Sequence, residues 1–109
     1  MKRGDVLIVS PPGEFGKARP AVIAQSSEMN ASAVASVIVC PITSYIENTP
    51  LFRVSLEPSS ENGLTKPSQI MVDKVQAISI KRIGNRIGKI NQDQTIQMNR
   101  TLAFVLGLD

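Results

Sequence analysis

The chain has 109 residues, of which 42% are hydrophobic and 19% charged, and its formal net charge is +3. This length and composition indicate one globular domain over residues 1–109, and they exclude both a disordered chain and a second domain of ordinary size. The weak positive charge favours an anionic partner such as nucleic acid or an acidic protein, although a mildly basic solvated surface explains it equally well.

The chain is predicted to form short β-strands separated by turn-rich loops. Residues 11–18 contain two prolines and two glycines and are expected to be a loop, as are the small polar residues 26–32. Residues 34–42 give the strongest strand signal, and Pro41 near the end of this segment predicts a bulge or an edge position there. Runs of β-branched and aliphatic residues predict strands over residues 5–10, 21–25, 34–42, 51–56, 69–72 and 75–80.

The last part of the chain predicts a turn and then a helix. Residues 81–88 contain two glycines and are expected to turn the chain. Asn91 suits a helix N-cap, with Gln94 in the capping-box position. Apolar residues then recur at helical spacing over residues 95–105, and Gly107 ends the segment. This order of elements predicts a mainly β protein, a small barrel capped by a C-terminal helix.

The sequence contains no histidine and only one cysteine, Cys40. Histidine is the commonest metal ligand and the side chain whose ordinary pKa lies nearest neutrality. The acidic residues are spread singly, without the spacing of a metal-ligand cluster. We therefore expect no metal and no cofactor, and chemistry that depends on Arg, Lys, carboxylates, hydroxyls and backbone amides.

The single cysteine also bears on the compartment. An intrachain disulfide is excluded, which fits a reducing environment, and the apolar neighbours of Cys40 predict a small core residue. Only four consecutive apolar residues follow the charged N-terminus, too few for a signal peptide or a transmembrane helix. We expect a soluble cytoplasmic protein with no membrane association.

Arg19 is the first candidate for a functional side chain. Pro20 follows it, and a proline pushes the preceding residue into extended geometry, so Arg19 is expected to be held at the mouth of a strand. A guanidinium offers five donors in a planar fork and keeps its proton at neutral pH, which suits a phosphate ligand. Lys17 adds a second cation two residues earlier.

Two other segments carry polar candidates that we expect on the same face of the barrel. Thr43 and Ser44 are hydroxyls at the end of a predicted strand and can donate to a phosphate oxygen, and Tyr45 can stack on a nucleobase. Asp73 and Lys74 lie between two later strands. Each of these side chains also has an ordinary structural explanation: a solvated charge, a turn hydroxyl bonded to its own backbone, or a core or rim aromatic.

Taken together, these segments resemble a known family. Arg3-Gly4-Asp5-Val6 opens the first strand, Gly16-x-x-Arg19-Pro20-Ala21-Val22-Ile23 forms the second segment, and Val37-Ile38-Val39-Cys40-Pro41-Ile42-Thr43-Ser44 forms the third. In this order and separation they resemble the MazF/PemK/Kid toxins of bacterial toxin–antitoxin systems. The resemblance spans essentially the whole chain.

The resemblance implies an SH3-like barrel of five to seven strands with a C-terminal helix, assembled as a homodimer. It also implies a metal-independent endoribonuclease that cuts single-stranded RNA, often messenger RNA and often at a short sequence. In this reaction the ribose 2′-hydroxyl attacks the adjacent phosphorus. Such chemistry suits a protein without histidine, because the substrate supplies the nucleophile and the enzyme orients it and stabilises charge. The implied protein partner is a cognate antitoxin whose acidic, partly disordered segment covers the basic groove.

The resemblance also implies roles for single residues. Arg19 matches the family's catalytic arginine and Thr43 its catalytic threonine. Glu14 lies where some members carry a functional glutamate, which makes it a candidate for the catalytic base. Met71 departs from the Kid branch, which has a basic residue at that position. The expected substrate-binding residues are Lys17, Ser44, Tyr45, Asp73 and Lys74.

Two alternatives stay open at this point. The same fold serves as a DNA gyrase poison in the related CcdB toxins, where the terminal helix would carry the function. A non-catalytic binding module of the same fold would bind RNA, more weakly as salt rises, without cutting it.

Overall fold

The fold is an antiparallel β-sheet with one long helix packed on it. The computed structural model describes residues 1–10, 17–29, 31–48 and 51–108. The strands are β1 Asp5–Val9, β2 Arg19–Ile23, β3 Ser36–Thr43, β4 Arg53–Leu56, β5 Ser68–Met71, β6 Gln76–Ser79 and β7 Ile83–Lys89. The helical elements are α1 Ala31–Val34, the 3₁₀ turns η1 Val72–Lys74 and η2 Ile80–Arg82, and α2 Gln92–Leu106.

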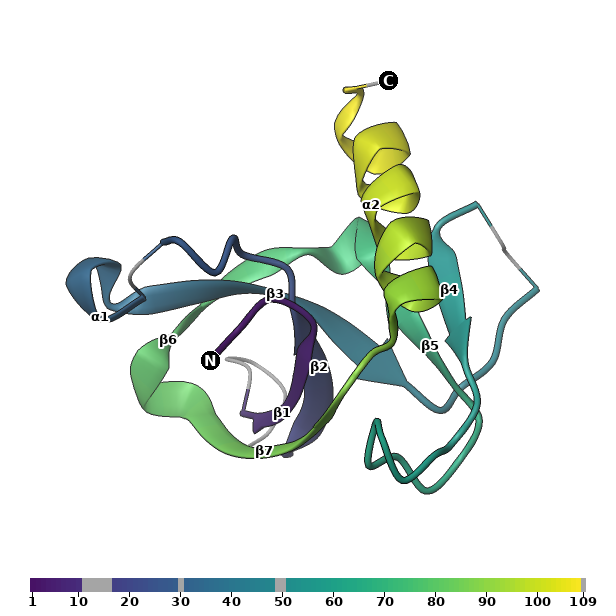
Figure 1. The fold of residues 1–109 in the computed structure, drawn as a ribbon, viewed down its shortest axis with the longest axis horizontal. Coiled ribbons are helices and arrows are strands. Elements are labelled where there is room, and N and C mark those ends of the chain that lie inside the picture. The colour runs from purple at the N-terminus through teal and green to yellow at the C-terminus, as the bar shows by residue number, and fades with distance from the viewer. Residues whose placement is uncertain (11–16, 30, 49–50, 109) are drawn as a thin grey trace.

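The seven described strands form one sheet in the order β4-β5-β3-β2-β1-β7, with β6 also paired to β3. In Figure 1 the strands β1, β2, β3, β6 and β7 curl around one side of the molecule, and α2 stands beside β4 and β5. The predicted mainly β fold with a C-terminal helix is confirmed. Within the described residues, the strand pairings end at β4 and β7, so no pairing closes the sheet into a barrel.

The central strand β3 carries a break in its ladder. Its pairing passes from Ile70 of β5, opposite Ile42, to Gln76 of β6, opposite Val39, so a step of three residues on β3 spans six on the other side. The turn η1 takes up the extra length. Pro41 lies within this step, so a residue without an N–H occupies the point where the ladder on this side of β3 is interrupted.

Alternation along the strands divides the apolar residues between two clusters. One cluster packs against α2, and its buried members include Val22, Cys40 and Met98. The other cluster lies on the opposite face of β1, β2 and β3, with Ile78 from β6. Because β2 contributes to both clusters, its short apolar run is buried on both faces.

Helix α2 begins and ends where the sequence predicts. The Asn91 side chain accepts a hydrogen bond from the Gln94 backbone N–H at 2.8 Å, and the Gln94 side chain accepts one from the Asn91 N–H at 2.9 Å, which completes a capping box. Gly107 ends the helix in the left-handed conformation, with φ 72°. Met98 is fully buried, and Leu102 and Val105 pack beside it against the sheet.

Two predictions about local structure are wrong. Residues 83–89 form β7, which pairs with β1, and not a turn. The glycine that suggested a turn serves a close approach, since a Cβ at Gly88 would collide with the backbone of Asn62. The second error concerns residues 26–34, predicted as a loop running into a strand. A short helix, α1, occupies Ala31–Val34, and Ala35 adopts a positive φ of 59° before β3 begins at Ser36.

Candidate functional site

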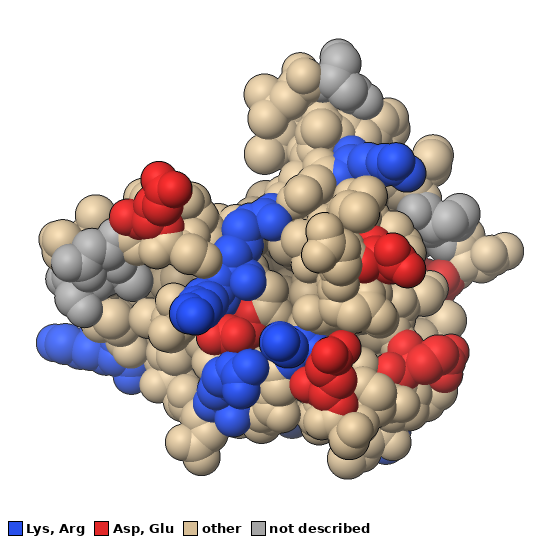
Figure 2. Space-filling view, viewed as in Figure 1, with Lys and Arg blue, Asp and Glu red and all other residues tan. Residues whose placement is uncertain are grey.

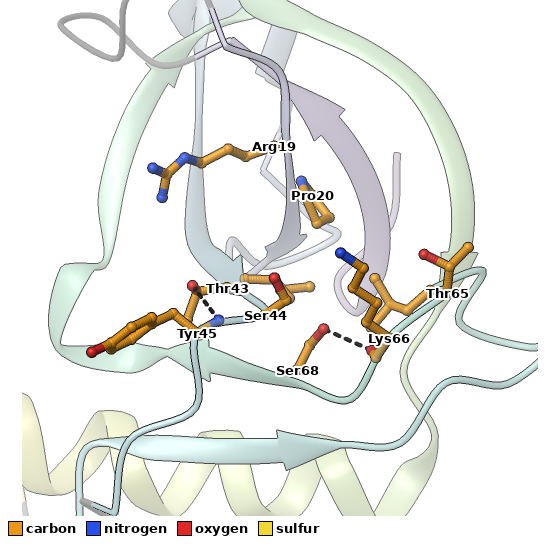
Figure 3. A pocket seen from close by; sticks show the side chains of 10 residues that line it. Arg19, Pro20, Thr43, Ser44, Tyr45, Thr65, Lys66 and Ser68 are labelled. Carbon is orange, nitrogen blue, oxygen red and sulfur yellow. Dashed lines mark hydrogen bonds between the residues drawn. The ribbon is translucent and has the colours of Figure 1, made fainter.

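A pocket of about 390 Å³ lies where β2 begins, β3 ends and the loop over residues 57–67 approaches them. Figure 3 shows the residues around it. They are Arg19, Pro20, Ile42, Thr43, Ser44, Tyr45, Leu64, Thr65, Lys66 and Ser68. Four of the sequence-predicted site residues, Arg19, Thr43, Ser44 and Tyr45, are therefore brought together here.

Arg19 is held by the sheet. It is the first residue of β2 and lies opposite Val9 of β1, so its backbone is extended, as expected of a residue before proline. Its side chain is half-buried, and Pro20 lines the pocket next to it. A guanidinium with a fixed backbone can present its donors to a phosphate in a defined direction.

Thr43 is the last residue of β3, and its hydroxyl oxygen accepts a hydrogen bond from the Tyr45 backbone N–H at 3.0 Å. A hydroxyl has one proton to donate besides its lone pairs. Since the oxygen already accepts from Tyr45, the proton of Thr43 is available for an acceptor in the pocket. Ser44 and Tyr45 are exposed, so both side chains are accessible to a ligand.

Lys66 is a pocket residue that the sequence analysis missed. In Figure 3 its ammonium group and the guanidinium of Arg19 lie on opposite sides of the Ser44 hydroxyl. The Ser68 hydroxyl donates a hydrogen bond to the Lys66 carbonyl at 2.9 Å, which fixes the backbone at this point. The sequence held a signal for it, because Lys66 precedes Pro67 just as Arg19 precedes Pro20.

The loop that carries Lys66 is organised by Asn62, which is only 2% exposed. The Asn62 side-chain oxygen accepts from the N–H groups of Ser59 and Leu64 at 3.0 and 2.9 Å, and its amide donates to the Glu57 carbonyl at 2.8 Å. Lys89 of β7 donates its backbone N–H to the Glu61 carbonyl. The loop is therefore tied both to itself and to the sheet.

The remaining predicted residues are placed differently. Asp73 and Lys74 belong to η1, form an ion pair with each other at 3.4 Å, and do not line this pocket. Lys17 is exposed and also does not line the pocket. Glu14 lies outside the described residues.

The charge of the molecule is unevenly distributed. Figure 2 shows a band of Lys and Arg side chains running down the middle of one face, with most of the Asp and Glu side chains to its right. Such a band attracts polyanions and acidic partners. Among the described residues, no group of three or more Asp, Glu, Cys or His side chains is arranged to hold a metal ion.

Cys40 takes no part in the pocket. It is fully buried in the cluster against α2, which confirms the prediction of a core residue. Burial raises the pKa of its thiol from 9.0 to about 12. The neutral thiol is therefore inert as a nucleophile at physiological pH.

Comparison with known proteins identifies relatives along the full length of the chain. A probable endoribonuclease MazF from Mycolicibacterium smegmatis is 33% identical over 109 residues, which cover 99% of this chain and 98% of that protein. The Mycobacterium tuberculosis toxin MazF-mt6 has a similar structure, with a TM-score of 0.78 and 25% identity over 95% of this chain and 98% of that one. A MazE–MazF structure from Deinococcus radiodurans shares the fold, with a TM-score of 0.79 and 18% identity over 98% and 95% of the two chains.

One family description covers nearly the entire sequence. Residues 2–106 match the PemK-like, MazF-like toxins of type II toxin–antitoxin systems. The chain belongs to this family of PemK-like, MazF-like toxins.

Proposed function

We propose that this chain is an endoribonuclease that cuts single-stranded RNA, with Arg19 and Thr43 acting on the phosphate. The observation that carries the proposal is that these two residues, from the start of β2 and the end of β3, line one pocket. The similarity to a probable endoribonuclease MazF supports the same activity.

In the proposed reaction the ribose 2′-oxygen forms a bond to phosphorus and the bond from phosphorus to the 5′-oxygen breaks. The 2′-hydroxyl loses its proton and the departing 5′-oxygen gains one, which leaves a cyclic phosphate and a 5′-hydroxyl. Arg19 stabilises the negative charge that develops on the phosphorane, and the Thr43 hydroxyl donates to one of its oxygens. Arginine holds its proton too tightly to be an efficient acid, so charge stabilisation is its main contribution.

Substrate binding is assigned to the residues around this pair. Ser44 donates a second hydroxyl, Tyr45 stacks on a base, and Lys17 attracts the RNA backbone. Asp73 and Lys74 do not line the pocket, so any contact from them is with RNA that extends beyond it. Glu14 stays a prediction for the base that accepts the 2′-hydroxyl proton.

The test is cleavage of single-stranded RNA by the purified protein in the presence of a chelator. Arg19→Ala and Thr43→Ala are each expected to slow cleavage at least about a hundredfold, the scale for loss of one electrostatic group in a transition state. A matched control is Lys81→Ala, which removes an exposed cation of η2 outside the pocket. Cleavage by Arg19→Ala at the wild-type rate contradicts the proposed mechanism.

The substrate itself provides a second test. A single 2′-deoxynucleotide at the cleaved position removes the nucleophile, and we expect that strand to stay intact while binding persists. The same experiments separate the alternatives. If the chain is a gyrase poison, its Arg19→Ala variant stays toxic to cells and the cells show DNA breaks. If it is a non-catalytic binding module, it binds RNA in a salt-dependent way without cutting it.

A regulating partner is also proposed. Structures of relatives include an endoribonuclease in complex with its cognate antitoxin from a mycobacterial species, at 24% identity and a TM-score of 0.78 over 100% of this chain and 97% of that one. We expect an acidic antitoxin to inhibit this chain by covering its basic surface. Measuring RNA cleavage with and without a synthetic acidic antitoxin peptide tests this inhibition. We also expect the chain alone to form a homodimer, and its mass in solution tests that.

The location of the protein is proposed from its activity. Messenger RNA as the substrate requires a protein in the cytoplasm, and fractionation of cells that express the chain tests this. In the described part of the chain, no helix has the length and apolar character needed to cross a membrane.

A further inference from the structure

Two side chains from β4 and β5 hold the segment that follows Thr43. Gln69 of β5 lies directly opposite Thr43 in the β3–β5 ladder and is only 6% exposed. Arg53 is the first residue of β4, and its side chain is only 11% exposed. Alternation along β4 places Arg53 on the face opposite the buried Val54 and Leu56, yet its side chain is largely covered.

The Gln69 side chain extends the sheet by imitating a peptide group. Its oxygen accepts from the Glu47 backbone N–H at 3.1 Å, and its amide donates to the Glu47 carbonyl at 2.9 Å. This pair of bonds ties residue 47 to β5 where no strand is present. The polar atoms of a buried glutamine are satisfied in this way, so the arrangement avoids a desolvation penalty.

Arg53 completes the arrangement. One of its terminal nitrogens, Nη1, donates to the Tyr45 carbonyl at 3.1 Å and to the Gln69 side-chain oxygen at 2.9 Å. The other nitrogen, Nη2, pairs with the Glu47 carboxylate at 3.4 Å. The planar fork of a guanidinium can reach these three acceptors at once, and an ammonium cannot.

Tyr45 connects Arg53 to Thr43 by hydrogen bonds of its backbone. The N–H of Tyr45 donates to the Thr43 hydroxyl oxygen, and the carbonyl of Tyr45 accepts from Arg53, so this residue is held at both ends. With Tyr45 fixed, the Thr43 oxygen keeps its N–H partner, and its own proton stays directed to another acceptor.

We infer that Arg53 and Gln69 are positioning residues that keep the Thr43 hydroxyl oriented for RNA cleavage, an inference that rests on the proposed function. Neither side chain lines the pocket, so their effect reaches the substrate through Tyr45 and Thr43. A small misplacement of a catalytic group lowers the rate of the chemical step, whereas RNA binding depends mainly on the cations and the tyrosine ring.

The kinetic test uses Arg53→Lys, which keeps the charge but loses the fork. We expect kcat to fall by about tenfold to a hundredfold and KM to rise by a smaller factor, because the Thr43 interaction acts in the transition state, whereas the Tyr45 ring is loosened but still present. Gln69→Leu is the second variant, an apolar side chain for a buried position, and it is expected to show the same split. The matched control is Arg100→Lys, the same change at an exposed arginine of α2 outside the pocket, and it is expected to keep kcat within about twofold of wild type.

Amide hydrogen exchange without RNA tests the positioning independently of cleavage. In Arg53→Lys the amides of Tyr45 and Glu47 are expected to exchange faster, while those of α2 keep their protection. Wild-type kcat in both Arg53→Lys and Gln69→Leu overturns the inference, as does unchanged protection at Tyr45. Failure of the wild-type protein to cut RNA overturns the proposed function instead, so the two failures are distinguishable.

Discussion

Arg19 and Lys66 each stand directly before a proline and line the same pocket, one from the start of β2 and the other from the loop before β5. Both backbones are held by neighbours, Arg19 by its pairing with Val9 and Lys66 by the hydroxyl of Ser68. These two cations, with the hydroxyls of Thr43 and Ser44 in the same pocket, are suited to bind successive phosphates of one RNA strand.

Lys66→Ala is therefore expected to weaken RNA binding more than chemistry. Removing one phosphate contact raises KM and lowers the slope of log affinity against log salt by about 0.7 for a single strand. Binding isotherms at several salt concentrations measure this slope. Lys81→Ala is the matched control, and an identical slope in Lys66→Ala and wild type contradicts a phosphate contact at Lys66.

The Asn62 loop gives a prediction about both stability and activity. Asn62→Ala removes an almost fully buried amide that makes three hydrogen bonds to the backbone of its own loop. We expect a loss of about 2–3 kcal/mol in the free energy of unfolding, because the backbone groups left behind are partly desolvated. KM for RNA is also expected to rise, since Lys66 is carried on this loop.

Urea unfolding and steady-state cleavage measure the two effects in the same preparation. Asn85→Ala, at an exposed position of β7, serves as the control and should change neither quantity. If Asn62→Ala destabilises the protein but leaves KM for RNA unchanged, the loop does not position Lys66.

The fold was largely predictable because its signals are local. The capping box at Asn91 and the dense β-branched residues of β3 act over a few residues and are visible in the sequence. Strand β7 was missed because its glycines serve a contact with distant residues: Gly88 meets the backbone of Asn62. A glycine selected for close packing and one selected for a turn look alike in a sequence.

The site was predictable in part, for the same reason. Arg19 and Thr43 were predicted from their own chemistry, as a cation before a proline and a hydroxyl at a strand end on the same face. Their catalytic roles came only from the resemblance to a family. The position of Lys66 in the pocket depends on how a long loop packs against β7, and local sequence patterns do not determine that packing. Arg53 lies on the face of β4 opposite the buried Val54 and Leu56, and period two does not report which polar groups cover a side chain.

Helix α2 provides a stability prediction. Met98 is its one buried residue, at 0% exposure, and it lies in the cluster shared with the sheet. Met98→Ala is expected to lower the free energy of unfolding by about 2–5 kcal/mol through lost burial and a residual cavity. Gln97→Ala, on the exposed side of the same turn, is expected to change it by less than about 0.5 kcal/mol. Denaturant unfolding measures both, and equal midpoints for the two variants contradict the packing described here.

Cys40 gives a prediction of pH dependence whose sign follows from its burial. Burial raises the pKa of the folded thiol from 9.0 to about 12, with smaller contributions from Arg3, which lowers it, and Asp73, which raises it. In the unfolded chain the Cys40 thiol ionises near its ordinary pKa. The contribution of the buried neutral thiol to stability is therefore complete at lower pH and is lost progressively as pH rises from about 9 toward 12.

The Cys40→Ala variant lacks the thiol and so tests this prediction. The difference in the free energy of unfolding between wild type and Cys40→Ala should shrink by up to about 1.4 kcal/mol per pH unit above pH 9. Urea titrations of both proteins between about pH 8 and pH 10.5 measure this difference. The contributions of the other groups that titrate in this range are the same in both proteins and cancel in the subtraction. A difference that is constant over this range contradicts the buried, neutral thiol.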